Sequence, residues 1–284
     1  MSMPIYICAI FRNESCYLKE WLEFHLIVGV EKFILYQNNS SDDYHAVLDS
    51  YIERGVVELV EWPMPNPSQF AAYQDCIYRY KGQRVWIGFF DCDEFCFSPK
   101  YNTLLEALES ILADHPSLGA LGVNWCCFGS GGQQHYSPAP VIARFTWRLA
   151  DSNPINAHIK SIVQMNQRVA VGGDPHFFMV ERGTANERGE WIGGPFSTYT
   201  GDLLRINHYC SKSYDEWVER SRLGKPDRAT LEIDPKWYWD RQATDLDDRG
   251  EDSIQRYLPE FQRRLELEAA KEAAKEAAKE KQHV

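Results

Sequence analysis

The chain has 284 residues, of which 44% are hydrophobic and 13% aromatic, and it carries a formal net charge of −11. This composition excludes a disordered protein, and the length allows a substantial core. The negative charge excludes a general nucleic-acid binder, because binding to a phosphate backbone requires a basic surface. We therefore expect no nucleic-acid partner.

Strand-like and helix-like segments alternate through the first part of the chain. Apolar, β-branched runs predict strands at residues 4–11, 32–37, 56–62, 85–90 and 118–128. Apolar residues at helical spacing predict helices at residues 14–30, 42–54, 68–80 and 101–115. This alternation predicts an α/β fold with a mostly parallel sheet and helices on both faces.

After residue 128 the regular alternation ends. Short strands are expected at residues 141–149, 158–165, 175–180 and 203–209, and the pattern from Ser213 is helical again. Near the C-terminus the chain repeats Glu-Ala-Ala-Lys, which favours a solvated helix. We expect one domain at residues 1–265, with a nucleotide-binding half at 1–128 and an acceptor half at 129–265, followed by a charged helical tail at 266–284.

The eight cysteines are spread along the chain without a Cys-x-x-Cys pair. Zinc sites use closer ligand spacing and disulfide frameworks belong to smaller secreted domains, so we expect reduced, mostly buried thiols. The first residues lack the features of a signal peptide, and no stretch reaches the roughly 20 apolar residues of a transmembrane helix. We expect a soluble, cytoplasmic protein; its oligomeric state stays open.

Two carboxylates one residue apart, Asp91 and Asp93, follow the apolar strand predicted at residues 85–90. The carboxyl ends of parallel strands border the ligand crevice of such a sheet, and the polar turns at residues 12–14 and 38–43 also follow strands. One crevice can therefore collect all three turns. Paired carboxylates suit Mn²⁺ or Mg²⁺, which keep open positions for substrate phosphates. A structural turn or a helix cap is the alternative interpretation.

Several motifs, read together in their order and spacing, carry a family resemblance. They are Arg12-Asn-Glu, Leu35-Tyr-Gln-Asn-Asn-Ser-Ser-Asp42, Phe90-Asp-Cys-Asp-Glu-Phe95, Trp125-Cys-Cys-Phe-Gly-Ser-Gly-Gly132, Lys160-Ser-Ile-Val163 and Asn207-His-Tyr-Cys-Ser-Lys-Ser213. The chain resembles glycosyltransferase family 92 and the related bacterial family 2-like group. This resemblance implies a GT-A fold and a metal-dependent, inverting hexosyltransferase. It would move a sugar such as galactose from a nucleoside-diphosphate sugar, first of all a UDP-sugar, to a glycan hydroxyl.

The resemblance also implies roles for individual residues. Asp91, Asp93 and His208 match the metal ligands of the family, and a satisfied core histidine is the alternative for His208. Donor contacts are implied for the residues of the first turns, the Asp-x-Asp segment and two Lys-Ser pairs: Arg12, Asn13, Glu14, Asn38, Asn39, Cys92, Lys160 and Lys212. The acceptor side is expected to include Trp125, Gly131, Gly132 and His176. Gln37 and Gln133 depart from the pattern of the family, in which Asp and His are frequent at these positions.

Inverting transfer also needs a carboxylate that takes the proton of the acceptor hydroxyl. Asp174 is the candidate, with a turn-forming aspartate as its alternative interpretation. Asp151, Glu94 and Asp245 are further candidates for this base. Two other functions stay open: a non-catalytic sugar-nucleotide-binding module, and a metal-dependent nucleotidyltransferase or phosphohydrolase.

Overall fold

The computed structural model describes residues 2–223, 247–250 and 253–282 of the chain. In the first half, strands and helices alternate as predicted: β1 (Ile5–Phe11), α1 (Ser15–Ile27), β2 (Lys32–Gln37), α2 (Tyr44–Glu53), β3 (Val57–Glu61), α3 (Gln69–Tyr80), β4 (Trp86–Phe89), β5 (Glu94–Phe97), α4 (Leu104–Asp114) and β6 (Ala120–Cys127). Strand β5 is an addition to the prediction, because the chain leaves the Asp-x-Asp turn directly into this short strand.

The second half consists mostly of short elements. They are α5 (Val141–Arg144), β7 (Trp147–Arg148), η1 (Pro154–Ala157), β8 (Ile159–Gln164), β9 (Val169–Val171), β10 (Phe178–Val180), β11 (Thr184–Ala185), β12 (Trp191–Ile192), β13 (Arg205–His208), α6 (Tyr214–Leu223), β14 (Asp247–Gly250), η2 (Ser253–Tyr257) and α8 (Leu258–Gln282). The strands predicted at residues 158–165, 175–180 and 203–209 are confirmed in part or whole, and the predicted tail belongs to the longer helix α8.

The strand predicted at residues 141–149 is wrong over most of its length. Its first residues form the helical turn α5, and only β7 is extended. The carboxylate of Glu20 accepts the backbone N–H groups of Val141 and Ile142 at 2.8 and 3.1 Å. A carboxylate at these N–H groups stabilises the start of a helical turn. Because Glu20 lies in α1, the local sequence contains no sign of this cap.

Ten of the described strands form one sheet, whose main path runs β12-β11-β6-β8-β4-β1-β2-β3, while β13 pairs with both β5 and β6. Strands β4, β1, β2 and β3 are parallel to one another. Strand β8 lies antiparallel between β4 and β6. A mostly parallel half followed by a smaller mixed β region confirms the expected α/β class.

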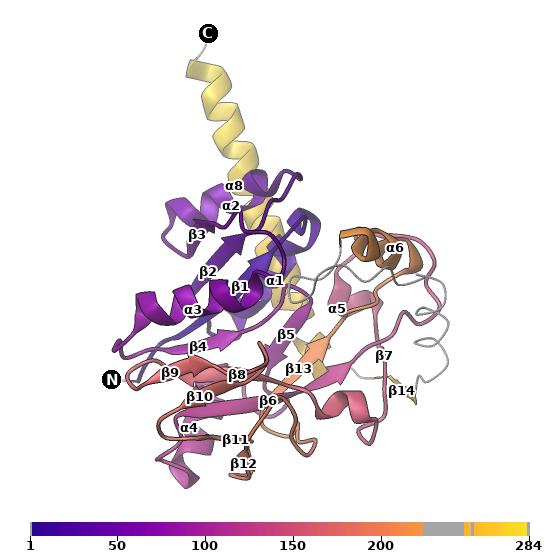
Figure 1. The fold of residues 1–284 in the computed structure, drawn as a ribbon. Helices are drawn as coiled ribbons and strands as arrows, with labels where there is room; N and C mark the ends of the chain where they lie inside the picture. Colours follow the sequence, from indigo (N-terminus) through magenta and orange to yellow (C-terminus); the bar gives the residue numbers. More distant parts are fainter. Residues whose placement is uncertain (1, 224–246, 251–252, 283–284) are drawn as a thin grey trace.

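Helices cover both faces of the sheet (Figure 1). Trp21 of α1 and Leu48 of α2 belong to the larger apolar core, whereas Tyr73 and Ile77 of α3 belong to a second core that includes Phe178 of β10. Strand β4 is buried along its whole length, as expected of a strand covered on both sides. Helix α8 packs against α1, and its C-terminal end extends beyond the rest of the fold (Figure 1).

All eight cysteines lie in the described part of the chain, and none of them forms a disulfide there. Six of them are buried, which agrees with the expectation of mostly buried thiols, while Cys16 is exposed and Cys210 half-buried. Across the residues that the structure covers, no helix combines the length and the apolar character needed to cross a membrane.

Candidate functional site

The Asp-x-Asp turn lies between β4 and β5, at the carboxyl end of β4. It borders a cavity of about 90 Å³ that also receives the turns after β1 and β2. Polar residues of these three turns line the cavity: Arg12, Glu14, Asn38, Asp91 and Asp93. Cys92, between the two aspartates, lines it as well. The expectation that one crevice collects all three turns is therefore confirmed.

A buried cluster of possible metal ligands lies beside this cavity. The ligand atoms of Asp93, Glu94 and His208 are all within 4.8 Å of one another. Asp93 Oδ1 is buried and has no hydrogen-bond partner within the described residues. Carboxylates and imidazole are suitable ligands for a divalent cation, and a bound cation would satisfy the unpartnered oxygen. The residues present therefore fit a divalent metal.

Asp91 is paired with protein groups instead. Its Oδ2 accepts a hydrogen bond from Lys160 Nζ at 2.8 Å, and its Oδ1 accepts one from Gln69 Nε2 at 2.9 Å. Lys160 is fully buried, and its Nζ is also 3.6 Å from the carboxylate of Glu94. Burial lowers the pKa of Lys160, but the charges of Asp91 and Glu94 raise it more, so this ammonium group is charged. Lys160 thus neutralises the turn from the interior, whereas the family resemblance implied a contact with the donor.

Asp93 has a cationic partner of its own. Arg220 Nη1 donates hydrogen bonds to Asp93 Oδ2 and, at 3.2 Å, to the carbonyl of Cys210. Burial raises the pKa of Asp93, but Arg220 and His208 lower it more, to well below its usual range. Burial also lowers the pKa of His208, which favours the neutral imidazole that a metal requires. Asp93 is therefore an ionised carboxylate in a basic environment.

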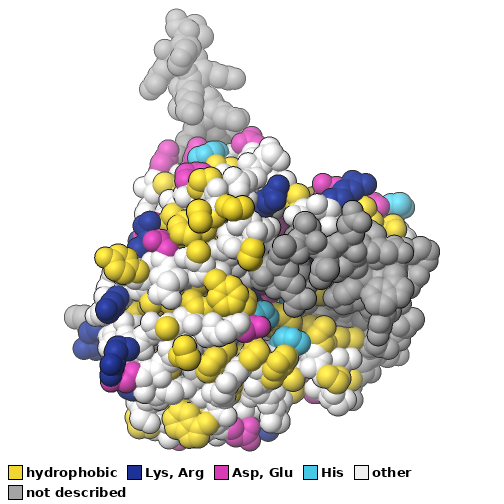
Figure 2. Space-filling view, in the orientation of Figure 1, with side chains coloured by type: hydrophobic (Ala, Val, Ile, Leu, Met, Phe, Trp, Pro, Cys, Tyr) yellow, Lys and Arg dark blue, Asp and Glu magenta, His cyan; other side chains and the backbone are white. Residues whose placement is uncertain are grey.

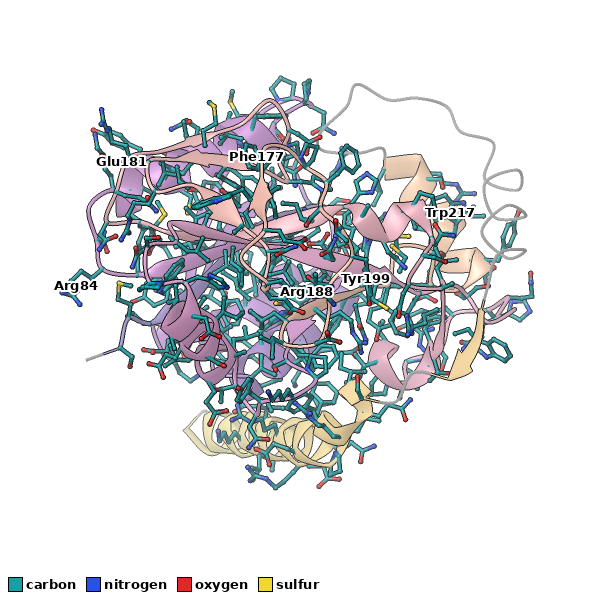
Figure 3. The ribbon with its side chains drawn as sticks, turned by 90° about the horizontal axis from the view of Figure 1, so that it is seen from below. Arg84, Phe177, Glu181, Arg188, Tyr199 and Trp217 are labelled. Atoms are coloured by element: carbon teal, nitrogen blue, oxygen red, sulfur yellow. The ribbon has the colours of Figure 1, made fainter. Side chains whose placement is uncertain are left out.

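Helix α6, which carries Arg220, is held against the fold by buried contacts. The carboxylate of Glu216 accepts two hydrogen bonds from Arg144 at 2.8 and 2.9 Å and one from the Tyr17 hydroxyl at 2.7 Å. Trp217, on the same helix, is buried as well (Figure 3). Contacts to α1 and α5 therefore determine where the backbone of α6 lies.

A series of aromatic and imidazole rings connects the group of possible metal ligands with the surface. The ring centre of Trp125 lies 4.2 Å from that of His208 and 4.9 Å from that of His158, on which Trp125 stacks. The ring centres of His158 and Phe196 are 4.6 Å apart. Phe196 is 56% exposed. The ring of His176 lies 5.0 Å from Trp125, and burial lowers the pKa of His176 to about 2, so that it is neutral. Figure 2 shows histidine side chains at the surface beside an acidic side chain and among hydrophobic ones.

The remaining predicted donor residues lie at different depths. Asn13, Glu14 and Lys212 line a neighbouring cavity of about 270 Å³ beside α6. Glu14 lines both cavities, and burial raises its pKa. Asn38 donates to two backbone carbonyls of the loop after β3, each at 2.8 Å, so its amide mainly fixes this turn. Asn39 is exposed and has a positive φ of 57°.

The predicted acceptor glycines belong to the loop that follows β6. Gly131 and Gly132 have φ angles of 57° and 81°, in the region that favours glycine. A Cβ atom on Gly131 would lie 3.0 Å from Trp147, whose side chain covers this turn. Trp147 therefore lies against Gly131, whereas a Cβ atom on Gly132 would meet no atom of the described residues within 4 Å.

The candidates for the catalytic base differ in accessibility. Asp174 is half-buried, and its Oδ1 accepts the backbone N–H of His176 at 2.9 Å, which is the geometry of the alternative, turn-forming interpretation. Asp151 forms an ion pair with a neighbouring arginine. Glu94 is fully buried and accepts the Trp125 N–H at 2.8 Å. Asp245 lies outside the described residues.

Several residues of the site were missed by the sequence analysis. Gln69 and His158 reach it through packing alone, and nothing in their local sequence indicates this. For Arg220 a signal exists, because it lies seven residues, or about two helical turns, after Ser213, the residue that precedes α6. Glu94 was predicted only as a candidate for the catalytic base, although it also belongs to the group of possible metal ligands.

Comparisons with known proteins identify the family of the chain. The sequence model of glycosyltransferase family 92 matches residues 4–167, more than half of the chain. A glycosyltransferase family 92 protein of Ricinus communis is 26% identical over 266 residues, which are 86% of this chain and 45% of that protein. The galactan beta-1,4-galactosyltransferase GALS3 of Arabidopsis thaliana is 29% identical over 103 residues, 33% of this chain and 20% of that protein.

Among solved structures, S. aureus TarS 1–349 in complex with UDP matches with a TM-score of 0.36 and 11% identity, over 57% of this chain and 47% of that one. The chain spans less than half of the length of the family 92 relatives that it matches most extensively. The match of the family model, which covers strands β1 to β4 and the Asp-x-Asp turn, shows that the chain belongs to glycosyltransferase family 92.

Proposed function

We propose that this chain transfers a sugar from a nucleoside-diphosphate sugar, first of all UDP-galactose, to a hydroxyl of a glycan, with inversion and with Mn²⁺ or Mg²⁺ as cofactor. The observation that carries the proposal is the buried, unpartnered Oδ1 of Asp93 beside His208, next to a cavity that collects three strand-end turns. Asp93 and His208 would hold the cation, and Asp91 lines the same cavity.

The donor would be bound by residues of the two neighbouring cavities. When bound, the cation supplies electrostatic stabilisation for the leaving diphosphate. Arg12, Asn13 and Glu14 would contact the nucleoside, since they belong to the turn after β1 and line the two cavities. Asn38, which lines the smaller cavity, would hold the turn after β2 in place beside it. Lys212, whose Nζ lies 4.1 Å from the centre of the Tyr17 ring, would add positive charge at the diphosphate.

The acceptor would approach along the ring series. Trp125 and His176 would offer the acceptor sugar an apolar ring surface and polar ring edges next to the possible metal ligands. Gly131 and Gly132 would allow the acceptor to approach the backbone closely. The name of the Arabidopsis relative suggests a β-1,4-linked galactan as acceptor. Asp174 remains the proposed base, because it is half-buried rather than fully buried and its loop carries His176.

The test is calorimetric titration of UDP with and without Mn²⁺ into the wild type, Asp93→Ala and Asp49→Ala. Asp49 is an exposed aspartate on α2 and is the matched control. We expect UDP binding that requires Mn²⁺, is lost in Asp93→Ala and is retained in Asp49→Ala. UDP binding that ignores both the metal and the Asp93→Ala change would contradict the proposal.

The products formed from UDP-galactose distinguish the alternative functions. Free galactose with intact UDP, or a lengthened galactan with UDP, identifies a glycosyltransferase. UMP together with galactose 1-phosphate identifies a phosphohydrolase acting on the diphosphate. Metal-dependent binding without turnover, either with galactan or without it, identifies a sugar-nucleotide-binding module.

A further inference from the structure

Arg220 holds the carboxylate to which the proposed function assigns a divalent cation. We propose that Arg220 is an exchange residue: its guanidinium neutralises Asp93 before the cation binds, and it moves to the donor diphosphate when the cation takes its place. This inference rests on the proposed function and adds to it a positioning role for α6.

The geometry of Asp93 supports such an exchange. Its Oδ2 is shared by Arg220 Nη1 and by His208 Nε2, the latter at 3.5 Å, while its Oδ1 is unpartnered. The Asp93 side chain is only 4% exposed, whereas that of Arg220 is 35% exposed. Of the two groups at Asp93 Oδ2, Arg220 therefore has the more exposed side chain, since that of His208 is 9% exposed.

The local charges make Arg220 and a divalent cation competitors. Asp91 is already neutralised by Lys160, which is fully buried. Departure of Lys160 would leave Asp91 without its counter-charge, which is energetically costly. Asp93 is thus the carboxylate of the turn whose partner reaches solvent. A guanidinium and a divalent cation at the same carboxylate would repel each other, so binding of the cation favours departure of Arg220.

A destination for the guanidinium lies within reach of the same helix. Arg220 lines both the cavity of about 90 Å³ and the neighbouring one of about 270 Å³, and Lys212 also lines the larger one. A guanidinium binds phosphate oxygens with two parallel hydrogen bonds. Because Glu216 and Trp217 fix the backbone of α6, the proposed exchange would take place through a change of the Arg220 side-chain rotamer.

The exchange predicts opposite effects of one substitution on two ligands. In Arg220→Ala the competitor of the cation is absent, so Mn²⁺ alone, followed by electron paramagnetic resonance, should bind about three- to tenfold more tightly than to the wild type. UDP at saturating Mn²⁺, followed by calorimetry, should bind about tenfold or more weakly, because a charge-assisted contact to the diphosphate is lost.

Arg222→Ala is the matched control, because Arg222 lies on the same helix, is 71% exposed and pairs with Glu219. It should leave both affinities unchanged. Arg220→Lys keeps the charge without the planar fork, and it should restore Mn²⁺ binding toward the wild-type value while recovering UDP binding only in part. If Arg220→Ala does not fold, the Mn²⁺ and UDP affinities of Arg220→Lys still test the inference.

The inference is overturned if removal of the guanidinium does not tighten Mn²⁺ binding, or if UDP binds the variant as tightly as the wild type. Weaker binding of both ligands would make Arg220 a structural support of Asp93 and would equally overturn it. Failure of the proposed function looks different, because the wild type itself would then show no Mn²⁺-dependent binding of UDP.

Discussion

Asp93 and His208 come from different halves of the chain, and Asp93 Oδ2 lies 3.5 Å from His208 Nε2. The antiparallel pairing of β5 with β13 produces this contact, because it places His208 opposite Glu94, directly after the Asp-x-Asp turn. On the other side of the imidazole, Nδ1 lies 3.8 Å from Cys127 Sγ. The ring is therefore oriented with Nε2 toward the carboxylates, as a metal ligand would need.

From this contact we expect His208→Ala to weaken Mn²⁺ binding by about tenfold or more, the range typical for lost support at a metal site. The measurement is a Mn²⁺ titration followed by electron paramagnetic resonance. His135→Ala is the control, because His135 is exposed and pairs with Asp215 at the surface. Equal Mn²⁺ affinity of the two variants would favour the alternative that His208 is a core histidine.

Lys160→Met should destabilise the fold strongly. The substitution leaves the carboxylates of Asp91 and Glu94 without their buried counter-charge, and breaking such a buried pair costs about 3–5 kcal/mol. The free energy of unfolding, measured in urea, tests this expectation. Lys32→Met removes a partly exposed pair with Glu58 and should cost less than about 1 kcal/mol. Similar losses in both variants would show that the buried lysine does not stabilise the turn.

The stabilising effect of Glu216 should depend on pH. Burial raises the pKa of Glu216, but hydrogen bonds from Arg144, Ser213 and Tyr17 outweigh burial and lower it from 4.5 to about 2. A carboxyl group with a lowered pKa in the folded state stabilises that state above its unfolded pKa, and this stabilisation is lost as the pH falls from 4.5 toward 2.

Glu216→Gln should therefore lower the melting temperature at pH 7, and the difference from the wild type should shrink between pH 4.5 and pH 2. Melting curves of both proteins across this range provide the measurement. Glu219→Gln, a change at an exposed pair on the same helix, is the control and should show little difference at any pH. A difference that stays constant down to pH 2 would contradict the assigned ionisation.

Phe196→Ala tests whether the ring series binds the acceptor. Phe196 is exposed, so the melting temperature should change little, while the KM for the proposed galactan acceptor should rise by about three- to tenfold through loss of a stacking surface. Hydrolysis of the donor in the absence of acceptor should stay unchanged. Trp191→Ala, at an exposed aromatic residue of β12, is the control, and an unchanged KM in Phe196→Ala would exclude Phe196 from the acceptor site.

Much of the framework follows from local sequence patterns. The apolar run that forms β4 and the helical spacing in α1 predict their elements, because burial of an apolar face depends mainly on periodicity. The position of Asp91 and Asp93 at the end of a buried strand likewise predicts the edge of the sheet at which they lie. The order of the family motifs adds His208 to the same site.

Only the tertiary structure decided which groups neutralise these carboxylates. Lys160 of β8 is buried and pairs with Asp91, and Arg220 of α6 pairs with Asp93. The local sequence cannot distinguish these cations from lysines and arginines at the surface, because the partner of a charge is set by long-range packing and strand register. The same reason explains α5, whose N-terminal cap, Glu20, comes from a helix far earlier in the chain.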